Sequence, residues 1–190
     1  MANEILVKTG LQFLFRDPTD FDTAAPFLPA TAANSLIIGT PTEVDIDLTG
    51  VAASGGARES DKLDLTTPWA SEWSVDACLE FETAPADGGV AVFYWAASPI
   101  AAAATGNPGG LTGTDADFTD TAGILGQFQW IGSLPLRNNV INIGHVGKFF
   151  PHFQHGILAC VNHGSTAMRS TATAMDETHI VMTEVITEIQ

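Results

Sequence analysis

The sequence predicts an all-β protein: a jelly-roll-like antiparallel β-sandwich with an extended N-terminal segment. Apolar residues fall on every second position from Trp73 to Phe81, which is the period of a strand with one buried face. Turn residues at 83–89 join this strand to an apolar run at 90–96, so the two predict a hairpin. No window of a dozen residues carries the 3.6-residue stripe of an amphipathic helix.

The first strand of this hairpin has two chemically different faces. The inner face is expected to be buried and consists of Trp73, Val75, Leu79 and Phe81. The outer face carries acids that are expected to contact solvent or a neighbouring molecule, and these are Asp76, Glu80 and Glu82.

Further strand-like runs follow one another at the spacing of a sandwich. They occupy residues 5–7, 11–15, 35–49, 62–65, 127–136, 140–150, 156–162 and 179–189. The last run is apolar on both faces, which predicts a central strand or a subunit contact. Cys78 and Cys160 lie inside predicted strands, where free buried thiols are expected, with a disulfide between the strands as the alternative.

A chain of 190 residues is long enough for one well-buried domain. Residues 1–34 are expected to form an extended strand or arm, able to add a strand to the sheet edge of a partner. Residues 35–190 are expected to form a single β-sandwich domain. Within it, residues 97–126 predict a long loop, and loops of that length tend to be functional or mobile.

The charge excludes one class of partner. Seven basic against 22 acidic residues give a formal net charge of −15, which repels phosphate, so no nucleic acid is expected to bind. No apolar run approaches the roughly 20 residues that cross a bilayer, so no membrane contact is expected. Glu4 stands where an export signal carries positive charge, which predicts synthesis in a cytoplasm without export.

Carboxylates and histidines form the candidate metal sites. Asp115, Asp117 and Asp120 have the close spacing of a calcium loop, but Asp120 and Gly126 occupy the positions that need glycine and glutamate, which favours a solvated loop. His152 and His155 are spaced to chelate zinc or iron, as in a cupin, yet no glutamate lies between residues 82 and 177. A structural or surface role is therefore predicted for all five histidines, His145, His152, His155, His163 and His179.

Catalytic motifs are also missing from the sequence. No GxSxG elbow is present, and the glycine-rich tract at 106–110 lacks the lysine of a phosphate-binding loop. We therefore predict no catalytic, cofactor-binding or metal-binding residues, and no enzyme activity.

Exposed aromatic residues are the candidates for sugar binding. Alternation places Trp73 in the core, and Trp130 lies in an apolar run that also predicts burial. Trp69 follows Pro68 outside a clean strand and is the candidate for an exposed aromatic. A glycan-binding module would use Trp69 or Trp95 beside the 97–126 loop.

Short stretches through nearly the whole chain resemble a family of tailed-bacteriophage virion proteins. They are NEILVKTG, AANSLIIGTPTEVDIDLTG, ARES, LEFETAPADGGVAVFYWAASP, GNPGG, QWIGSLPL, HVGKFFPHFQHGILACVNHGSTA and HIVMTEVITEIQ. The resemblance implies a non-enzymatic particle component of a jelly-roll or related fold, located in the virion. It implies a capsid decoration (cement) protein, a homotrimer contacting the major capsid protein or other virion proteins. A tail or head-completion protein and a glycan-binding module on the virion surface are the alternatives.

Overall fold

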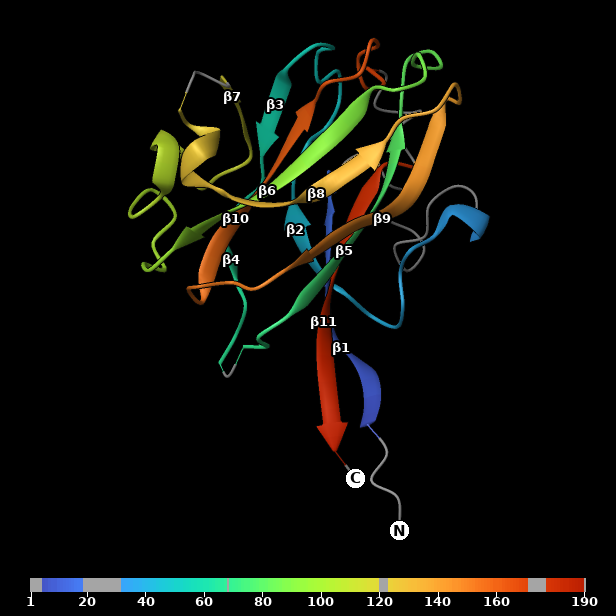
Figure 1. Ribbon diagram of the computed structural model, residues 1–190. Coiled ribbons are helices and arrows are strands. Elements are labelled where there is room, and N and C mark those ends of the chain that lie inside the picture. Colours follow the sequence, from blue (N-terminus) through green and yellow to red (C-terminus); the bar gives the residue numbers. More distant parts are fainter. Residues whose placement is uncertain (1–4, 19–31, 68, 120–122, 171–176, 190) are drawn as a thin grey trace.

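The computed structural model describes residues 5–18, 32–67, 69–119, 123–170 and 177–189, and Figure 1 shows how they are arranged. The described residues form strands joined by turns and by three short 3₁₀ helices. The strands are β1 (Ile5–Arg16), β2 (Thr42–Asp45), β3 (Gly56–Glu59), β4 (Leu63–Asp64), β5 (Trp73–Glu80), β6 (Val90–Ser98), β7 (Ala116–Thr119), β8 (Gln129–Pro135), β9 (Ile141–Phe149), β10 (His155–Asn162) and β11 (His179–Ile189). The 3₁₀ helices are η1 (Ala32–Asn34), η2 (Pro108–Gly110) and η3 (Leu125–Gln127).

These strands form one curled sheet, which confirms the prediction of an all-β, mostly antiparallel fold of the sandwich or jelly-roll-like kind. The strand order is β2-β1-β11-β5-β9-β8-β6-β10-β3-β7, and β4 also pairs with β10. Among the described pairings, β1 with β2 is parallel and the others are antiparallel.

The sheet folds over at the contact between β8 and β9. These strands pair only between Gly132 and Gly147, and both positions need glycine. A Cβ on Gly132 would lie 2.0 Å from the Val146 carbonyl oxygen, and one on Gly147 would lie 2.4 Å from that of Ile131. The two backbones therefore approach closely enough for one half of the sheet to pack on the other.

The core lies between the two halves. Phe13 and Trp73 meet with ring centroids 5.5 Å apart, and Trp95 meets Phe149 at 5.2 Å. The predicted inner face of β5 is confirmed, since its four residues, Trp73, Val75, Leu79 and Phe81, are all fully buried. Side chains from strands far apart in sequence share this core.

Both cysteines are free and buried, as predicted. Burial raises the pKa of each thiol to about 12, with Glu177 and Glu80 adding to the effect at Cys78. The thiols therefore stay protonated at neutral pH, which makes them poor nucleophiles.

The segment predicted as a long loop contains more structure than the sequence indicated. Strand β7 lies within it and pairs with β3. Phe128 packs against Tyr94 and Phe118, at ring-centroid distances of 6.4 and 6.2 Å, in a second apolar cluster on the outer side of β6 and β10. Strands β3 and β7 escaped prediction because GARE and ADFT are short and lack an apolar alternation.

The N-terminal segment is partly described. Its two predicted runs form one strand, β1, which pairs with β11 and β2 of the same chain. Residues 19–31 lie outside the described residues, so the division at residue 34 remains a prediction.

Candidate functional site

Strands β1 and β11 extend as a two-stranded ribbon beyond the body of the sheet, with both chain ends at its tip (Figure 1). They pair from Ile5 and Ile189 to Phe15 and Ile180. On the far side of β1, strand β2 pairs only with residues 13–16. On the far side of β11, strand β5 pairs only with residues 179–184. Residues 5–9 and 185–189 therefore make up the part that we call the ribbon.

A register shift between Thr9 and Gln12 marks the base of the ribbon. The Leu11 N–H donates a hydrogen bond of 2.9 Å to the Glu184 carboxylate at this shift. Gly10 leaves room for that carboxylate, because a Cβ there would lie 2.1 Å from Glu184 Oε2. Leu11 is 44% exposed and Ile186 is 38% exposed, so two large apolar side chains lie uncovered beside the base.

The pairing register sorts the ribbon residues into two kinds of pair. The pairs Ile5 with Ile189, Val7 with Thr187 and Thr9 with Val185 carry no charge. The alternate pairs, Leu6 with Glu188 and Lys8 with Ile186, each carry one charge. Strand edges without a neighbour present free N–H and C=O groups, which is the chemistry of strand addition.

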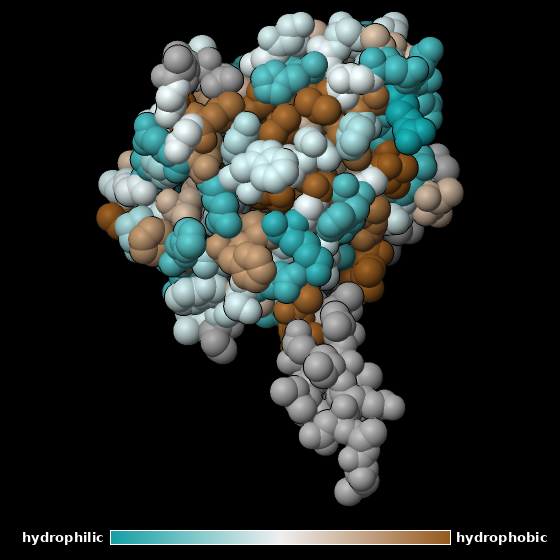
Figure 2. Space-filling view, viewed as in Figure 1, coloured by the Kyte–Doolittle hydropathy of each residue, from teal (hydrophilic) through white to brown (hydrophobic). Residues whose placement is uncertain are grey.

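Apolar and polar residues are mixed on the face of the body that Figure 2 shows. Figure 2 shows them interspersed on one face, with apolar residues also where the ribbon leaves the body. Large apolar side chains that remain exposed on the described residues are Leu11, Ile38, Trp69, Ile100, Trp130, Ile143, Phe150, Phe153 and Ile186. Within the described ranges, exposed Ile186 lies in the ribbon and exposed Leu11 lies beside its base, next to strand edges that pair with no further strand there.

The aspartates that have the spacing of a calcium loop belong to an ion-pair network and do not form an open site. The Arg58 guanidinium donates two hydrogen bonds to Asp115, one of them 2.8 Å long, and one of 3.1 Å to Asp117. Asp47 lies 3.7 Å from the same guanidinium. These hydrogen bonds raise the pKa of Arg58, and the hydrogen bonding to Asp115 has the largest effect. Asp120 lies outside the described residues.

A small cavity of about 350 Å³ lies beside this network, lined by β1, β2 and residues 61–66. Asp45 lines it, and burial raises the pKa of Asp45 to about 6, with the negative charges of Asp115 and Asp61 adding to the effect. Four carboxylates border this cavity, those of Glu43, Asp45, Asp61 and Asp64. Glu43 is paired with Arg16, which ties β2 to β1.

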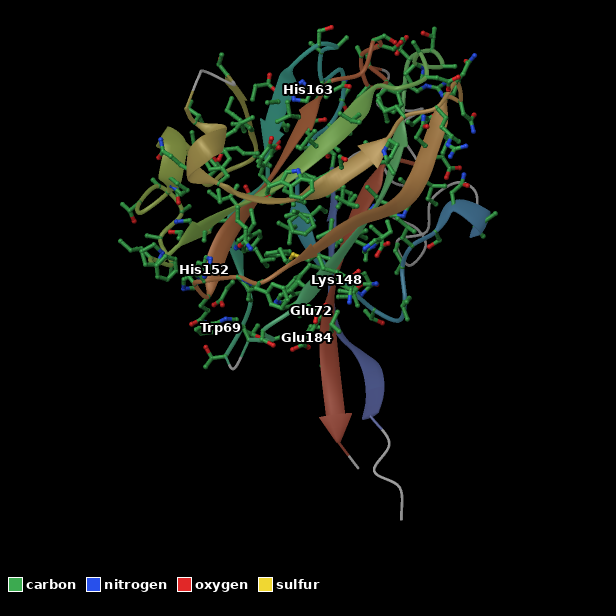
Figure 3. All side chains as sticks on the ribbon, in the orientation of Figure 1. Trp69, Glu72, Lys148, His152, His163 and Glu184 are labelled. Atoms are coloured by element: carbon green, nitrogen blue, oxygen red, sulfur yellow. The ribbon has the colours of Figure 1, made fainter. Side chains whose placement is uncertain are left out.

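The histidines do not converge. His145 Nδ1 lies 3.1 Å from Asp76, and His155 Nδ1 lies 3.8 Å from Asp64. His152 and His163 lie at different ends of the molecule (Figure 3). No group of three or more metal-ligating side chains occurs in the described part of the chain.

His179 is fully buried and both of its ring nitrogens have partners. Nδ1 lies 2.8 Å from the Glu177 carbonyl oxygen, and Nε2 accepts a hydrogen bond of 3.2 Å from the Leu36 N–H. Since Nε2 accepts, Nδ1 carries the proton and donates to the carbonyl. Burial lowers the pKa of His179, which favours this neutral form.

Two tryptophan predictions were wrong. Trp130 was expected in the core but is 62% exposed, and Trp95, the candidate for sugar binding, is fully buried. The cause at Trp130 is a β-bulge, because Phe93 pairs with Gly132 and Tyr94 with Trp130, leaving Ile131 as the extra residue. Ile131 enters the core and Trp130 is turned outwards. Trp69 is exposed, as predicted.

Among the acids that follow the outer face of β5, Glu80 is buried, which corrects the expectation of solvent or neighbour contact for this residue, whereas Glu82 is exposed as expected. Glu80 is buried and pairs with Arg169. Glu82 accepts hydrogen bonds of 3.0 and 3.2 Å from the N–H and hydroxyl of Ser170. Residues 167–169 run beside this end of β5, where the Arg169 N–H donates to the Glu80 carbonyl and the Glu82 N–H donates to the Ala167 carbonyl.

The Lys62 ammonium organises the start of the 97–126 segment. It lies within 3.2 Å of Ser98 Oγ and of three carbonyl oxygens, those of Ile100, Ala102 and Thr105. Burial lowers the pKa of Lys62. One side chain therefore satisfies several backbone carbonyls of this segment.

Comparisons with known proteins returned no matching family model, no similar curated protein and no similar solved structure. No helix in the described ranges has the length and apolar character to cross a membrane.

Proposed function

We propose that this protein is a non-enzymatic structural component of a phage particle, a capsid decoration protein that stabilises the shell through contacts between subunits. The ribbon is the structural observation that supports the proposal most. At one end of a well-packed body it places two strand edges that have no neighbouring strand in the part of the chain that the structure describes, beside the exposed residues Leu11 and Ile186. A protein that acts by association needs such a surface together with a rigid scaffold.

Two further observations support this proposal. The sequence stretches that resemble tailed-phage virion proteins run through nearly the whole chain. The polar groups that were candidates for chemistry are engaged in structural contacts, as Asp115 is with Arg58 and Glu80 with Arg169. The partner would be the major capsid protein or another virion protein, and a tail or head-completion position is the rival location.

The test is binding to particles assembled without this protein. Purified full-length chain is mixed with such particles and pelleted, and saturable binding to heads together with a higher melting temperature of the shell is expected. Binding to isolated tails alone would place the protein there instead. Failure to bind either would overturn the proposal.

A glycan-binding module on the virion surface is the second candidate, favoured by one observation. The Trp130 side chain is exposed on strand β8, beside the bulge at Ile131, with Tyr94 opposite on β6. Exposed indole rings stack on sugar rings through their apolar faces. A glycan array separates this candidate: Trp130→Ala should abolish any binding, whereas Phe150→Ala, which removes another exposed aromatic, should not. An array without signal for the unchanged protein would exclude it.

A further inference from the structure

The cavity beside β2, which we call the groove, is walled by two parts of the sheet. Strands β1 and β2 form one side, and residues 61–66, which include β4, form the other. Its volume is about 350 Å³. The apolar residues that line it are Leu11, Phe13, Val44 and Leu63. Leu11 is 44% exposed, so one wall of the groove is a large apolar side chain that the fold leaves uncovered.

Strand β2 is an edge strand with backbone groups that face away from its neighbour β1. The Ile46 N–H, just beyond the strand, donates to the Arg16 carbonyl on β1. The Asp45 carbonyl accepts from the Asp61 N–H on the other side. Backbone groups of successive residues point to opposite sides of a strand, so those of Glu43 face the same way as the Asp45 carbonyl. Within the described ranges no strand pairs with that side of β2, which is where a further strand adds.

The negative charge of the groove is only partly neutralised. Of its four bordering carboxylates, Glu43 pairs with Arg16. No cation contacts the Asp45 carboxylate in the part of the chain that the structure describes. Burial and the charges of Asp115 and Asp61 raise the pKa of Asp45 to about 6. These neighbours repel the Asp45 carboxylate, so a positive group beside it would stabilise its charged form.

The lysines and arginines of this chain are used elsewhere. They are Lys8, Arg16, Arg58, Lys62, Arg137, Lys148 and Arg169. Lys62 lines the groove, but its ammonium bonds to Ser98 and to carbonyls of residues 100–105. Four others pair with carboxylates, Lys8 lies in the ribbon, where β2 does not reach, and Arg137 follows β8. A second copy, with its net charge of −15, would add repulsion. A cation for Asp45 is therefore expected from a different molecule.

We propose that the groove binds an extended segment of a partner protein in which apolar and basic residues alternate, and that this segment adds a strand to β2. Its basic residues pair with Asp45 and with the other carboxylates of the groove. The inference goes beyond the proposed function, because it gives the protein a second contact surface, separate from the ribbon edges, and specifies the chemistry of the segment that binds there.

The alternation follows from the two faces of β2. Val44 is buried, whereas its neighbours Glu43 and Asp45 are exposed and half-buried. Side chains of an added strand alternate in the same way as those of the strand that it joins. Such a segment places apolar residues beside Val44 and basic residues beside the two acids, where opposite charges on neighbouring strands stabilise the contact. A metal ion is less favoured, since the described residues contain no group of three or more side chains placed to ligate one.

A nuclear magnetic resonance titration of the full chain tests this inference. The probe is a synthetic peptide of three Val-Lys repeats with blocked ends, added to millimolar concentration. Saturable shifts are expected in the backbone amides of residues 42–45 and 61–64, and the peptide should lower the pKa of Asp45 below about 6. The control peptide carries glutamate in place of lysine and should cause no such shift. Absence of these shifts with the Val-Lys peptide, or shifts spread over the whole acidic surface, would overturn the inference.

Two variants that each remove one negative charge locate the contact. Asp45→Asn should weaken binding of the Val-Lys peptide about fivefold, because a half-exposed charge pair is lost. Asp76→Asn removes the same charge from β5, outside the groove, and should change the affinity by less than about twofold. Equal losses in the two variants would indicate general electrostatic attraction and would contradict the inference.

Two further measurements separate this inference from its rivals. Calcium chloride in place of the peptide should not shift the amides of the groove. If calcium shifts them and the peptide does not, the groove is a metal site and the inference fails. If particles bind the chain while the peptide does not, the proposed function stands and this inference fails. If the peptide binds and particles do not, the inference stands without the proposed function.

Discussion

Strands β1 and β11 behave differently in the body and in the ribbon. In the body, Phe15 and Ile180 are opposite each other and fully buried, with further strands on both sides. A few residues away in the same strands, Leu11 beside the base of the ribbon and Ile186 within it are exposed. The residue types are similar, so the difference comes from neighbouring strands and not from the apolar character of the sequence. The part of each strand in the body stabilises the fold, and under the proposed function the ribbon part is the one that would associate with a partner.

Truncating one isoleucine in each region of β11 tests this comparison most strongly. Ile180→Ala removes a fully buried side chain and should lower the free energy of unfolding by about 3 kcal/mol. Ile186→Ala should change it by less than about 1 kcal/mol in the isolated chain, because much of that side chain is already exposed. Urea unfolding of the two variants measures the difference, and equal losses would contradict the comparison.

A substitution at the contact between β8 and β9 is expected to destabilise the fold nearly as much. Gly132→Ala puts a methyl group against the Val146 carbonyl, and relieving that clash separates β8 from β9, at a cost of about 2 to 3 kcal/mol. Gly126→Ala is the control, since a Cβ there meets nothing within 4 Å. Thermal melts of the two variants should differ clearly. An unaffected Gly132→Ala protein would show that the β8–β9 approach does not hold the halves together.

Removing the cation that pairs with a buried carboxylate should destabilise the fold more than removing one from an exposed ion pair. Both losses should be smaller than those above. Arg169→Met leaves the buried Glu80 carboxylate without this cation, and we expect a loss of about 2 kcal/mol. The control is Lys148→Met, which removes the partner of Glu72 at 2.7 Å (both labelled in Figure 3). Lys148 is half exposed, so a loss of about 0.5 kcal/mol is expected there. Denaturant titration at pH 7 compares them.

The smallest effect is expected at the edge of the body, where Asp45 lines the cavity. Its pKa is about 6 in the folded protein against 3.8 as a model value, so the folded state holds the proton more tightly. Stability should therefore fall as pH rises from about 4 to about 6 and level off above, by about 1 kcal/mol after screening by solvent. Asp45→Asn should remove this part of the pH dependence and be more stable at pH 7. An unchanged profile would contradict the assignment.

Local periodicity predicted the scaffold well. The alternation from Trp73 to Phe81 identified a strand and its buried face, because side chains alternate at every residue regardless of what the strand pairs with. The two-sided apolar run at 179–189 indicated a central strand or a contact, and β11 is central over residues 179–184. These features depend on residues that are close in sequence.

The candidate site was only partly predictable. The sequence indicated that residues 1–34 would supply an added strand, but not that β1 would pair with β11 of its own chain and leave both strands projecting. Trp130 also escaped prediction, because the bulge at Ile131 is visible only in the register with β6. The partner of Glu80 is Arg169, 89 residues away.

The sequence by itself determined the fold class, the buried face of β5, the free thiols and the acidic surface. The tertiary structure decided which apolar residues remain exposed, which carboxylates are paired, and where strand edges stay open. The physical reason is the distance along the sequence over which each kind of interaction acts. Alternation, charge and turn chemistry act between residues adjacent in the chain, whereas register, bulges and ion pairs depend on segments that only the folded sheet brings together.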